Sequence, residues 1–259
     1  MEQDPRAWIT TLRNSHERLA SVVKPLSPEQ LRAQSYDTEW NVAQVLSHMG
    51  SGAEISLMGL PSALGQAEPV DRAAFQPVWD TWNAKSPDEQ AADALVSDEK
   101  YVTALEQLSD DDLARISLQF FGLNLDSVGL IRLRLGEHAI HTWDVAVSFD
   151  PAARVSADAV SLLIDNVPQF LAPRLGRAPD VPFKIRIRTT GPDRDYLLVG
   201  ADPVSMTDWP GNGADSEVSM PAEALLRLAY GRLDPAHTPA GVVADPADLD
   251  RLRRMFPGF

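Results

Sequence analysis

The sequence contains no cysteine, and this absence excludes several kinds of chemistry at once. Disulfide bonds, cysteine nucleophiles and cysteine-based zinc sites are all ruled out, so any metal ion must be held by His, Asp or Glu. Basic residues are also scarce, with 23 Lys and Arg against 37 Asp and Glu and a formal net charge of −14. Such a chain repels phosphate backbones and anionic lipid surfaces, so we expect neither nucleic acid nor a membrane as its partner.

Long apolar runs are missing as well. No segment approaches the roughly 18 consecutive apolar residues of a membrane span, and the first residues, MEQDPRAW, do not resemble a secretory signal. P-loop, G-x-G-x-x-G and G-x-S-x-G motifs do not occur, so the usual signals of nucleotide enzymes and triad hydrolases are absent. With 44% hydrophobic residues over 259 positions, we expect a soluble, cytoplasmic protein with a sizeable core.

Apolar residues at helical spacing dominate the first two thirds of the chain. The pattern predicts helices over about 7–23, 41–58, 73–108 and 127–147, and a further helix from Ser156 to Val167. Gly59 and Pro61 are expected to end the second of these helices. Pro77 and Pro87 are expected to interrupt the third stretch.

The pattern changes after Pro173, where the segment PRLGRAPDVP has the composition of a linker. Beyond it, Phe183, Ile185 and Ile187 alternate with basic residues, which is the period of a half-buried strand. Further strands are expected at 196–199 and near 218–220, and helices at 222–230 and 246–255. We therefore predict an α+β protein with a helical bundle over 1–175 and a small α+β domain over 176–259.

Among five histidines, the most informative spacing is Glu137-x-x-x-His141. Residues at i and i+4 share one face of a helix, so both side chains can point at one ion, whereas His138 is rotated by about 100° and is the weaker ligand candidate. His48 is the obvious third ligand, because polar residues are scarce on that face of its helix. Three protein ligands leave an open position, as in catalytic zinc sites. The spacing is also compatible with a solvated Glu–His pair and a hydrogen-bonded core histidine.

Other polar residues carry weaker signals. His16 is expected on the surface of the first helix, and His237 in a loop. Asp144 follows His141 by three residues and is a candidate to orient a ligand, although a solvated helix residue is the simpler interpretation. Arg232 is a candidate to bind an anion above the metal, the alternative being a surface arginine near a helix end.

Three motifs in sequence order make the chain recognisable. They are Trp40-Asn41-Val42-Ala43-Gln44-Val45-Leu46-Ser47-His48, then Glu137-x-x-x-His141, then Trp143-Asp144-Val145-Ala146. This order resembles the mycothiol-dependent maleylpyruvate isomerase family, a branch of the DinB-like metal-binding four-helix bundles. The resemblance covers nearly the whole chain, with Trp82-Asn83 as a further feature and a C-terminal part similar to sterol-carrier folds. It implies a divalent metal, usually zinc, on His48, Glu137 and His141.

The resemblance further implies an enzyme that uses mycothiol or a similar low-molecular-weight thiol and an electrophilic small-molecule substrate. Because the chain has no cysteine, the thiol must come from a cofactor. A metal-bound thiolate could add to an electrophilic double bond. Elimination would then give cis–trans isomerisation, and retention of the adduct would give S-transfer. Two alternatives remain open, a zinc-water hydrolase and a non-enzymatic carrier of a small ligand.

Overall fold

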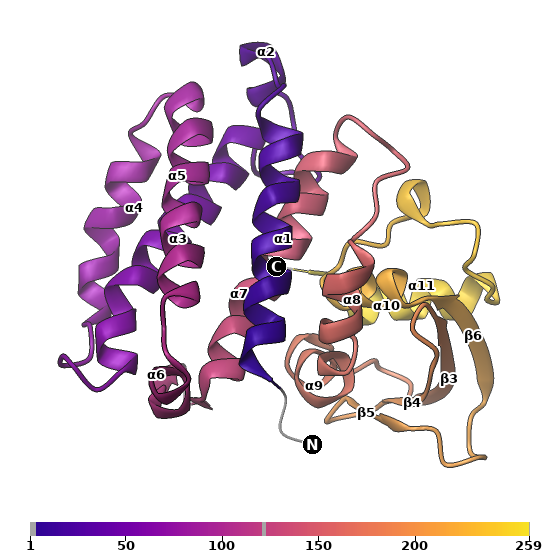
Figure 1. The fold of residues 1–259 in the computed structure, drawn as a ribbon. Helices are drawn as coiled ribbons and strands as arrows, with labels where there is room; N and C mark the ends of the chain where they lie inside the picture. The colour runs from indigo at the N-terminus through magenta and orange to yellow at the C-terminus, as the bar shows by residue number, and fades with distance from the viewer. Residues whose placement is uncertain (1–3, 121–122, 259) are drawn as a thin grey trace. The chain divides into compact units, whose positions relative to one another are not determined.

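The computed structural model describes residues 4–120 and 123–258. Within this part the chain divides between Ala153 and Arg154 into two compact units. The first unit is built almost entirely of helices, and the second combines a sheet with helices (Figure 1). The α+β class predicted from the sequence is confirmed.

The first unit contains four long helices that pack side by side in the described part of the chain (Figure 1). Each of α1, α5, α3 and α7 contacts two of the other three, in the cyclic order α1–α5–α3–α7. The elements in chain order are α1 (Pro5–Val23), α2 (Pro28–Leu31), α3 (Val42–Ala63), η1 (Arg72–Ala74), α4 (Phe75–Asn83), α5 (Pro87–Glu106), α6 (Asp110–Arg115), β1 (Leu118–Phe120), β2 (Leu123–Leu125) and α7 (Ser127–Val147). The helix α4 packs on α3, and β1 and β2 form an antiparallel hairpin.

Apolar periodicity explains why these helices bury the faces they do. Leu12 and Leu19 of α1, Leu46 of α3 and Leu135 of α7 are each 0% exposed and fill the interior of the unit. Full burial of one such side chain stabilises the fold by about 1.5–3 kcal/mol. The predicted span 127–147 is the observed span of α7.

Two proline predictions were wrong, for local reasons. Pro61 does not end α3, which continues to Ala63. The helical hydrogen bonds go on past the proline, since Leu64 N donates to Leu60 O at 3.0 Å. Pro77 lies in the first turn of α4, where a missing N–H leaves no hydrogen bond unmade.

The second unit contains a four-stranded sheet in the order β5-β4-β3-β6. Its elements are α8 (Ala157–Leu163), η2 (Val167–Leu171), α9 (Ala172–Leu175), β3 (Phe183–Thr190), β4 (Arg194–Gly200), β5 (Ser205–Asp208), β6 (Ser216–Pro221), α10 (Ala222–Ala229), η3 (Pro235–His237) and α11 (Pro246–Met255). The pairs β3–β4 and β4–β5 are antiparallel, and β3–β6 is parallel. Alternate residues of β3 are buried, as the period of two predicted.

The division between the units differs from the predicted boundary at residue 175. The helix α8 packs on α10, and η2 packs on both β5 and α10, so residues 154–175 belong with the sheet. Val160, Leu163 and Ile164 of this segment are at most 1% exposed in the chain. The Pro- and Gly-rich segment therefore lies inside the unit, where it forms the end of α9 and the connection from α9 to β3.

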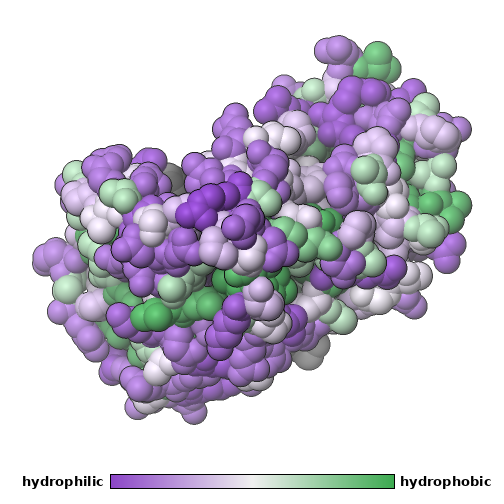
Figure 2. Space-filling view, turned by 90° about the horizontal axis from the view of Figure 1, so that it is seen from above, coloured by the Kyte–Doolittle hydropathy of each residue, from purple (hydrophilic) through white to green (hydrophobic). Residues whose placement is uncertain are grey.

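In the space-filling view, hydrophilic residues predominate and hydrophobic ones form smaller patches between them (Figure 2). None of the helices that the structure describes combines the length and apolar character needed to cross a bilayer.

Candidate metal centre

The helix α3 carries the first predicted ligand, and its start is fixed by a capping box. The Asn41 side chain accepts a hydrogen bond from Gln44 N at 2.9 Å, and the Gln44 side chain accepts one from Asn41 N at 2.9 Å. These bonds satisfy two of the donors that a helix start leaves unpaired. His48 follows on the second turn, with 40% of its side chain exposed.

The other two predicted ligands lie on α7, which Asp126 caps. Glu137 Oε2 is 3.3 Å from His48 Nε2 and 3.5 Å from His141 Nε2. The two imidazole rings lie 4.9 Å apart between centroids. One ligand-type atom from each of the three side chains lies within 4.8 Å of the other two. The structure thus brings together the three residues that the spacing and the resemblance selected.

Asp144 determines which nitrogen of His141 faces this cluster. Its Oδ2 lies 2.9 Å from His141 Nδ1, and Asp144 is 0% exposed. A carboxylate that accepts from Nδ1–H leaves Nε2 directed at the cluster, which is how ligating histidines are commonly oriented. Asp144 is therefore buried and not solvated, and its role of orienting a metal ligand stays a prediction.

The ionisation of the cluster is set by its own contacts. The partial burial of Glu137 acts to raise its pKa, but the close imidazoles of His141 and His48 outweigh it and hold that pKa well below its usual range. Burial alone would lower the pKa of His141, but Asp144 and Glu137 outweigh it and raise the pKa of His141 to about 9. Without a metal, the site therefore pairs an anionic carboxylate with a protonated imidazole.

The separations test whether a metal ion fits. A tetrahedral ion with bonds of about 2.0–2.2 Å holds its ligand atoms about 3.3–3.6 Å apart. The distances of 3.3 Å and 3.5 Å from Glu137 Oε2 to the two imidazole nitrogens fall within this range and are longer than ordinary hydrogen bonds. A donor set of two imidazoles and one carboxylate is one that divalent zinc accepts. The residues present therefore fit such an ion.

An aromatic side chain flanks the cluster. The Trp40 ring centroid lies 5.1 Å from that of His48 and 6.4 Å from that of His141. The backbone of Trp40 is anchored, because its carbonyl accepts a hydrogen bond of 2.6 Å from Ser35 Oγ. Trp40 thus forms an apolar wall beside both imidazoles.

A second polar cluster lies inside the first unit, and we name it the Asp98 network. It comprises Ser15 and His16 of α1, Asp98 of α5, and Arg134 and His138 of α7. Asp98 Oδ2 lies 2.8 Å from both His16 Nδ1 and His138 Nε2. Asp98 Oδ1 accepts from Arg134 Nη2 at 2.7 Å, and Ser15 Oγ lies 2.8 Å from His138 Nδ1. All five residues are buried.

Sequence reasoning missed this cluster, and the predicted surface position of His16 was wrong. The side chain is buried because His16 lies four residues after Leu12 and three before Leu19, on the same buried face of α1. That spacing was the available signal. Nothing local in the sequence connects His16 with Asp98, which lies 82 residues further along the chain.

The Asp98 network has the geometry of hydrogen bonding and not of metal ligation. Ligand-type atoms of His16, Asp98 and His138 also lie within 4.8 Å of one another. However, their contacts of 2.8 Å are those of hydrogen bonds and are shorter than the about 3.3–3.6 Å expected around a tetrahedral ion. The guanidinium of Arg134 also already neutralises the charge of Asp98.

Comparison with known proteins identifies the family. The model of the mycothiol maleylpyruvate isomerase N-terminal domain matches residues 12–146, and that of the MDMPI C-terminal domain matches residues 154–252. The chain belongs to the mycothiol maleylpyruvate isomerase family. The family resemblance predicted from the three motifs is thereby confirmed, and the chain is a member of an enzyme family.

Solved structures of the mycothiol-dependent maleylpyruvate isomerase share this fold. The chain is 15% identical to that enzyme, with a TM-score of 0.67 and 94% of each chain covered. A structure of its variant with a histidine replaced by alanine matches at 14% identity, with the same TM-score and coverage. No curated protein matches the chain.

In this member of the mycothiol maleylpyruvate isomerase family, Arg232 lies in the second unit. It is 6% exposed, and its Nη1 donates to Tyr230 O at 2.8 Å, so it is not the surface arginine of the simpler interpretation. It follows Gly231, whose φ of +75° and close approach to Gly258 leave no room for a side chain. His237 ends the three-residue η3 in the connection between α10 and α11, and its Nδ1 lies 2.8 Å from Asp234 Oδ2. The anion-binding role of Arg232 stays a prediction.

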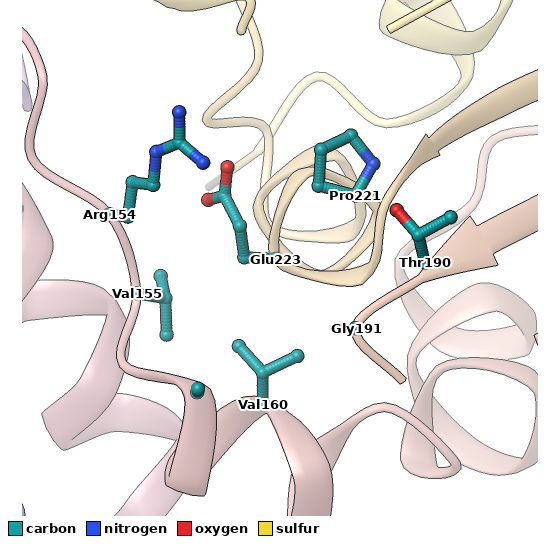
Figure 3. Close-up of a pocket in the computed structure, with 8 residues that line it drawn as sticks. Arg154, Val155, Val160, Thr190, Gly191, Pro221 and Glu223 are labelled. Carbon is teal, nitrogen blue, oxygen red and sulfur yellow. The ribbon is translucent and has the colours of Figure 1, made fainter. Parts of the chain in front are cut away.

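The second unit also contains a pocket of about 320 Å³ (Figure 3). Val155 and Val160 line one wall and Pro221 the opposite one, while Arg154 and Glu223 bring charged groups to it. This volume is at the lower end of the roughly 300–1,000 Å³ of small-molecule sites.

Proposed function

We propose that this protein is a mycothiol-dependent isomerase that holds one divalent ion, preferably zinc, on His48, Glu137 and His141. The observation that carries the proposal is the convergence of these side chains from α3 and α7 at separations of 3.3 Å and 3.5 Å. Family membership supports it, because the similar solved structures are those of a mycothiol-dependent maleylpyruvate isomerase.

The three donor side chains determine which reactions a bound ion could support. Three protein ligands leave one position of a tetrahedral ion open, which is typical of catalytic sites. An ion bound there would lower the pKa of a thiol ligand and so supply a thiolate at neutral pH. The chain has no cysteine of its own, so the open position serves a thiol from outside.

The protein's own residues prepare this site. Asp144 holds Nδ1 of His141 and directs Nε2 at the cluster. Glu137 provides a carboxylate that stays ionised at neutral pH, because its pKa is held low. His141 must lose its proton to become a ligand, so metal uptake releases a proton. Trp40 limits the access of water on its side of the two imidazoles.

We further propose that Arg232 offers a positive charge to an anionic group of the thiol or of the substrate. A chain with a net charge of −14 repels carboxylates, so a local cation is needed for binding. A folded, metal-replete Arg232→Ala protein should show a raised KM. Unchanged turnover and substrate affinity would rule the role out.

The experiment that tests the proposed function is an isomerase assay on the purified, zinc-loaded protein. Maleylpyruvate is supplied with mycothiol, without thiol, and with glutathione, and the product is followed by chromatography. The His48→Ala protein and a chelator-treated sample test metal dependence. His237→Ala, a change in the second unit, is the matched control.

We expect turnover to require both metal and thiol. Turnover should be at least 100-fold lower in His48→Ala, since loss of a catalytic group lowers rates by about 100-fold or more, and it should be unchanged in His237→Ala. A product that retains the thiol would indicate S-transfer. Turnover that needs metal but no thiol would point to the hydrolase alternative. Absence of turnover together with tight binding of apolar ligands would point to the carrier.

A further inference from the structure

The Asp98 network contacts the chain directly beside two of the three proposed metal ligands. Arg134 Nη2 donates to Asp98 Oδ1 at 2.7 Å and to the carbonyl of Met49 at 2.9 Å, and Met49 is the residue after His48. His138 Nε2 lies 2.8 Å from Asp98 Oδ2, and His138 is the residue after Glu137. The Asp98 carboxylate on α5 is therefore linked to Met49, which follows the proposed ligand His48 on α3. It is also linked to His138, which follows the proposed ligand Glu137 on α7.

Burial makes these links strong. Asp98 and His138 are 0% exposed, and Met49 is 1% exposed, so water does not compete for the hydrogen bonds. In such surroundings a buried polar network favours one arrangement of the elements that it joins, because each broken contact leaves a further buried group without a partner. Ser15 Oγ, 2.8 Å from His138 Nδ1, fixes the other side of that ring.

The geometry of α7 turns this constraint into a constraint on the metal site. Successive residues of a helix point about 100° apart, so holding His138 toward Asp98 determines the direction of Glu137. A rotation of α7 by about 15° would move an atom roughly 6 Å from the helix axis by about 1.5 Å. A metal site accepts deviations of only about 0.2 Å in its bonds.

We propose that Asp98 is a positioning residue for the metal centre: through Arg134 and His138 it fixes α3 and α7 so that His48, Glu137 and His141 converge. The inference rests on the proposed function, since it assigns Asp98 a role toward the ion proposed there. Asp98 itself does not ligate that ion. It stands 39 residues before Glu137 in sequence and on a different helix, and it lies outside the three motifs quoted above.

The test is a titration of the full-length apoprotein with Co²⁺, whose visible absorption reports the coordination geometry. Wild type, Asp98→Asn and Arg134→Met are compared at a temperature at which all are folded. Leu105→Ala is the matched control, because it leaves a cavity in the same helix α5 at a side chain that is 0% exposed and makes no polar contact. The double variant Asp98→Asn/Arg134→Met completes a double-mutant cycle, which shows whether the two residues act together on Co²⁺ binding.

Asp98→Asn and Arg134→Met are each expected to raise the Kd for Co²⁺ by 10- to 100-fold and to change the absorption bands, as is usual when groups supporting metal ligands are altered. The double variant should bind about as weakly as the weaker single one, because both act through one network. Leu105→Ala should bind within about threefold of wild type despite its lower stability. If Asp98→Asn does not fold, Arg134→Met carries the same test.

Distinct results would overturn the inference. Wild-type affinity and spectrum in the folded Asp98→Asn or Arg134→Met protein would show that Asp98 does not position the site. An equal loss of Co²⁺ affinity in Leu105→Ala would show that lower folding stability alone weakens Co²⁺ binding. Two Co²⁺ ions in wild type and one in Asp98→Asn would make the network itself a metal site. Failure of wild type to bind Co²⁺ would instead refute the proposed function, and the inference with it.

Discussion

At the scale of single residues, Asp144 makes one buried contact with His141, a residue that we propose as a metal ligand. Its carboxylate lies 2.9 Å from His141 Nδ1 and is shielded from solvent, so the orientation of the imidazole does not depend on the ion. The sequence alone suggested this contact, because residues three apart on a helix are neighbours. It could not show that Asp144 is buried, which depends on the helices around it.

Replacing Asp144 by Asn should weaken metal binding. The amide keeps the shape but loses the charge that stabilises the Nδ1–H side of His141, so we expect the Kd for zinc to rise about 10- to 100-fold. Competition with a chromogenic chelator measures this. Asp126→Asn at the start of the same helix is the control, since Asn caps helices as well as Asp does. If Asp144→Asn binds zinc as tightly as wild type, Asp144 does not support metal binding and contributes only to the structure.

Asp98 makes folding stability depend on pH in a defined direction. Burial alone would raise its pKa, but the contacts with His138, Arg134 and His16 outweigh burial and hold the pKa well below the ordinary 3.8. As the pH falls, the unfolded chain therefore takes up this proton before the folded one does. The stability that Asp98 contributes is complete above about pH 5 and is lost as the pH falls through 3.8 toward the folded pKa.

We expect wild type to have a larger unfolding free energy than Asp98→Asn at neutral pH. The difference between the two unfolding free energies should decrease steadily between about pH 5 and pH 3. Urea unfolding followed by tryptophan fluorescence at several pH values measures it. A difference that stays constant down to pH 3 would contradict the assigned ionisation of Asp98.

At the scale of elements, the helices were predictable because periodicity and capping are local. The span of α7 and the capping boxes at Asn41 and Ser86 follow from residues close together in sequence. The strand β5 was missed because it has four residues and buries only Met206 along its length. The Asp98 network was missed because its members come from three helices, and no local pattern relates them.

Close packing of α3 against its neighbours depends on Gly50. A Cβ there would lie 2.2 Å and 2.4 Å from ring atoms of Trp82 and 2.9 Å from Ala94 Cα. Gly50→Ala should therefore lower the unfolding free energy by about 1–3 kcal/mol, the usual cost of overpacking. Gly59→Ala is the control in the same helix, because a Cβ there meets nothing within 4 Å. It should be neutral or stabilise by up to about 1 kcal/mol. Similar effects of both changes would contradict this packing.

At the scale of the whole molecule, the two-part organisation was predictable from the change of pattern, but the place of the boundary was not. Helical periodicity continues through α8, so sequence assigned it to the helical part. Its burial against α10 in the second unit is a tertiary contact that periodicity cannot reveal. The family models place the division similarly, between residues 146 and 154.

Two fragments test the boundary. Residues 154–259 retain α8 and η2, and we expect a folded fragment with dispersed amide resonances in an NMR spectrum. Residues 176–259 lack the buried side chains of Val160, Leu163 and Ile164, so α10 loses the elements packed on it. That shorter fragment should give a collapsed spectrum and no cooperative thermal transition. Equally dispersed spectra would instead support a boundary near 175.

The account as a whole depends on whether His48, Glu137 and His141 bind a metal ion. Elemental analysis of zinc-loaded, desalted protein tests this directly, with wild type, His48→Ala, His141→Ala and the control His237→Ala measured side by side. We predict one zinc per chain in wild type and in His237→Ala, and at least a tenfold loss in the other two, because removing one of three ligands abolishes tight binding. Full zinc retention in both His48→Ala and His141→Ala would contradict the assigned site.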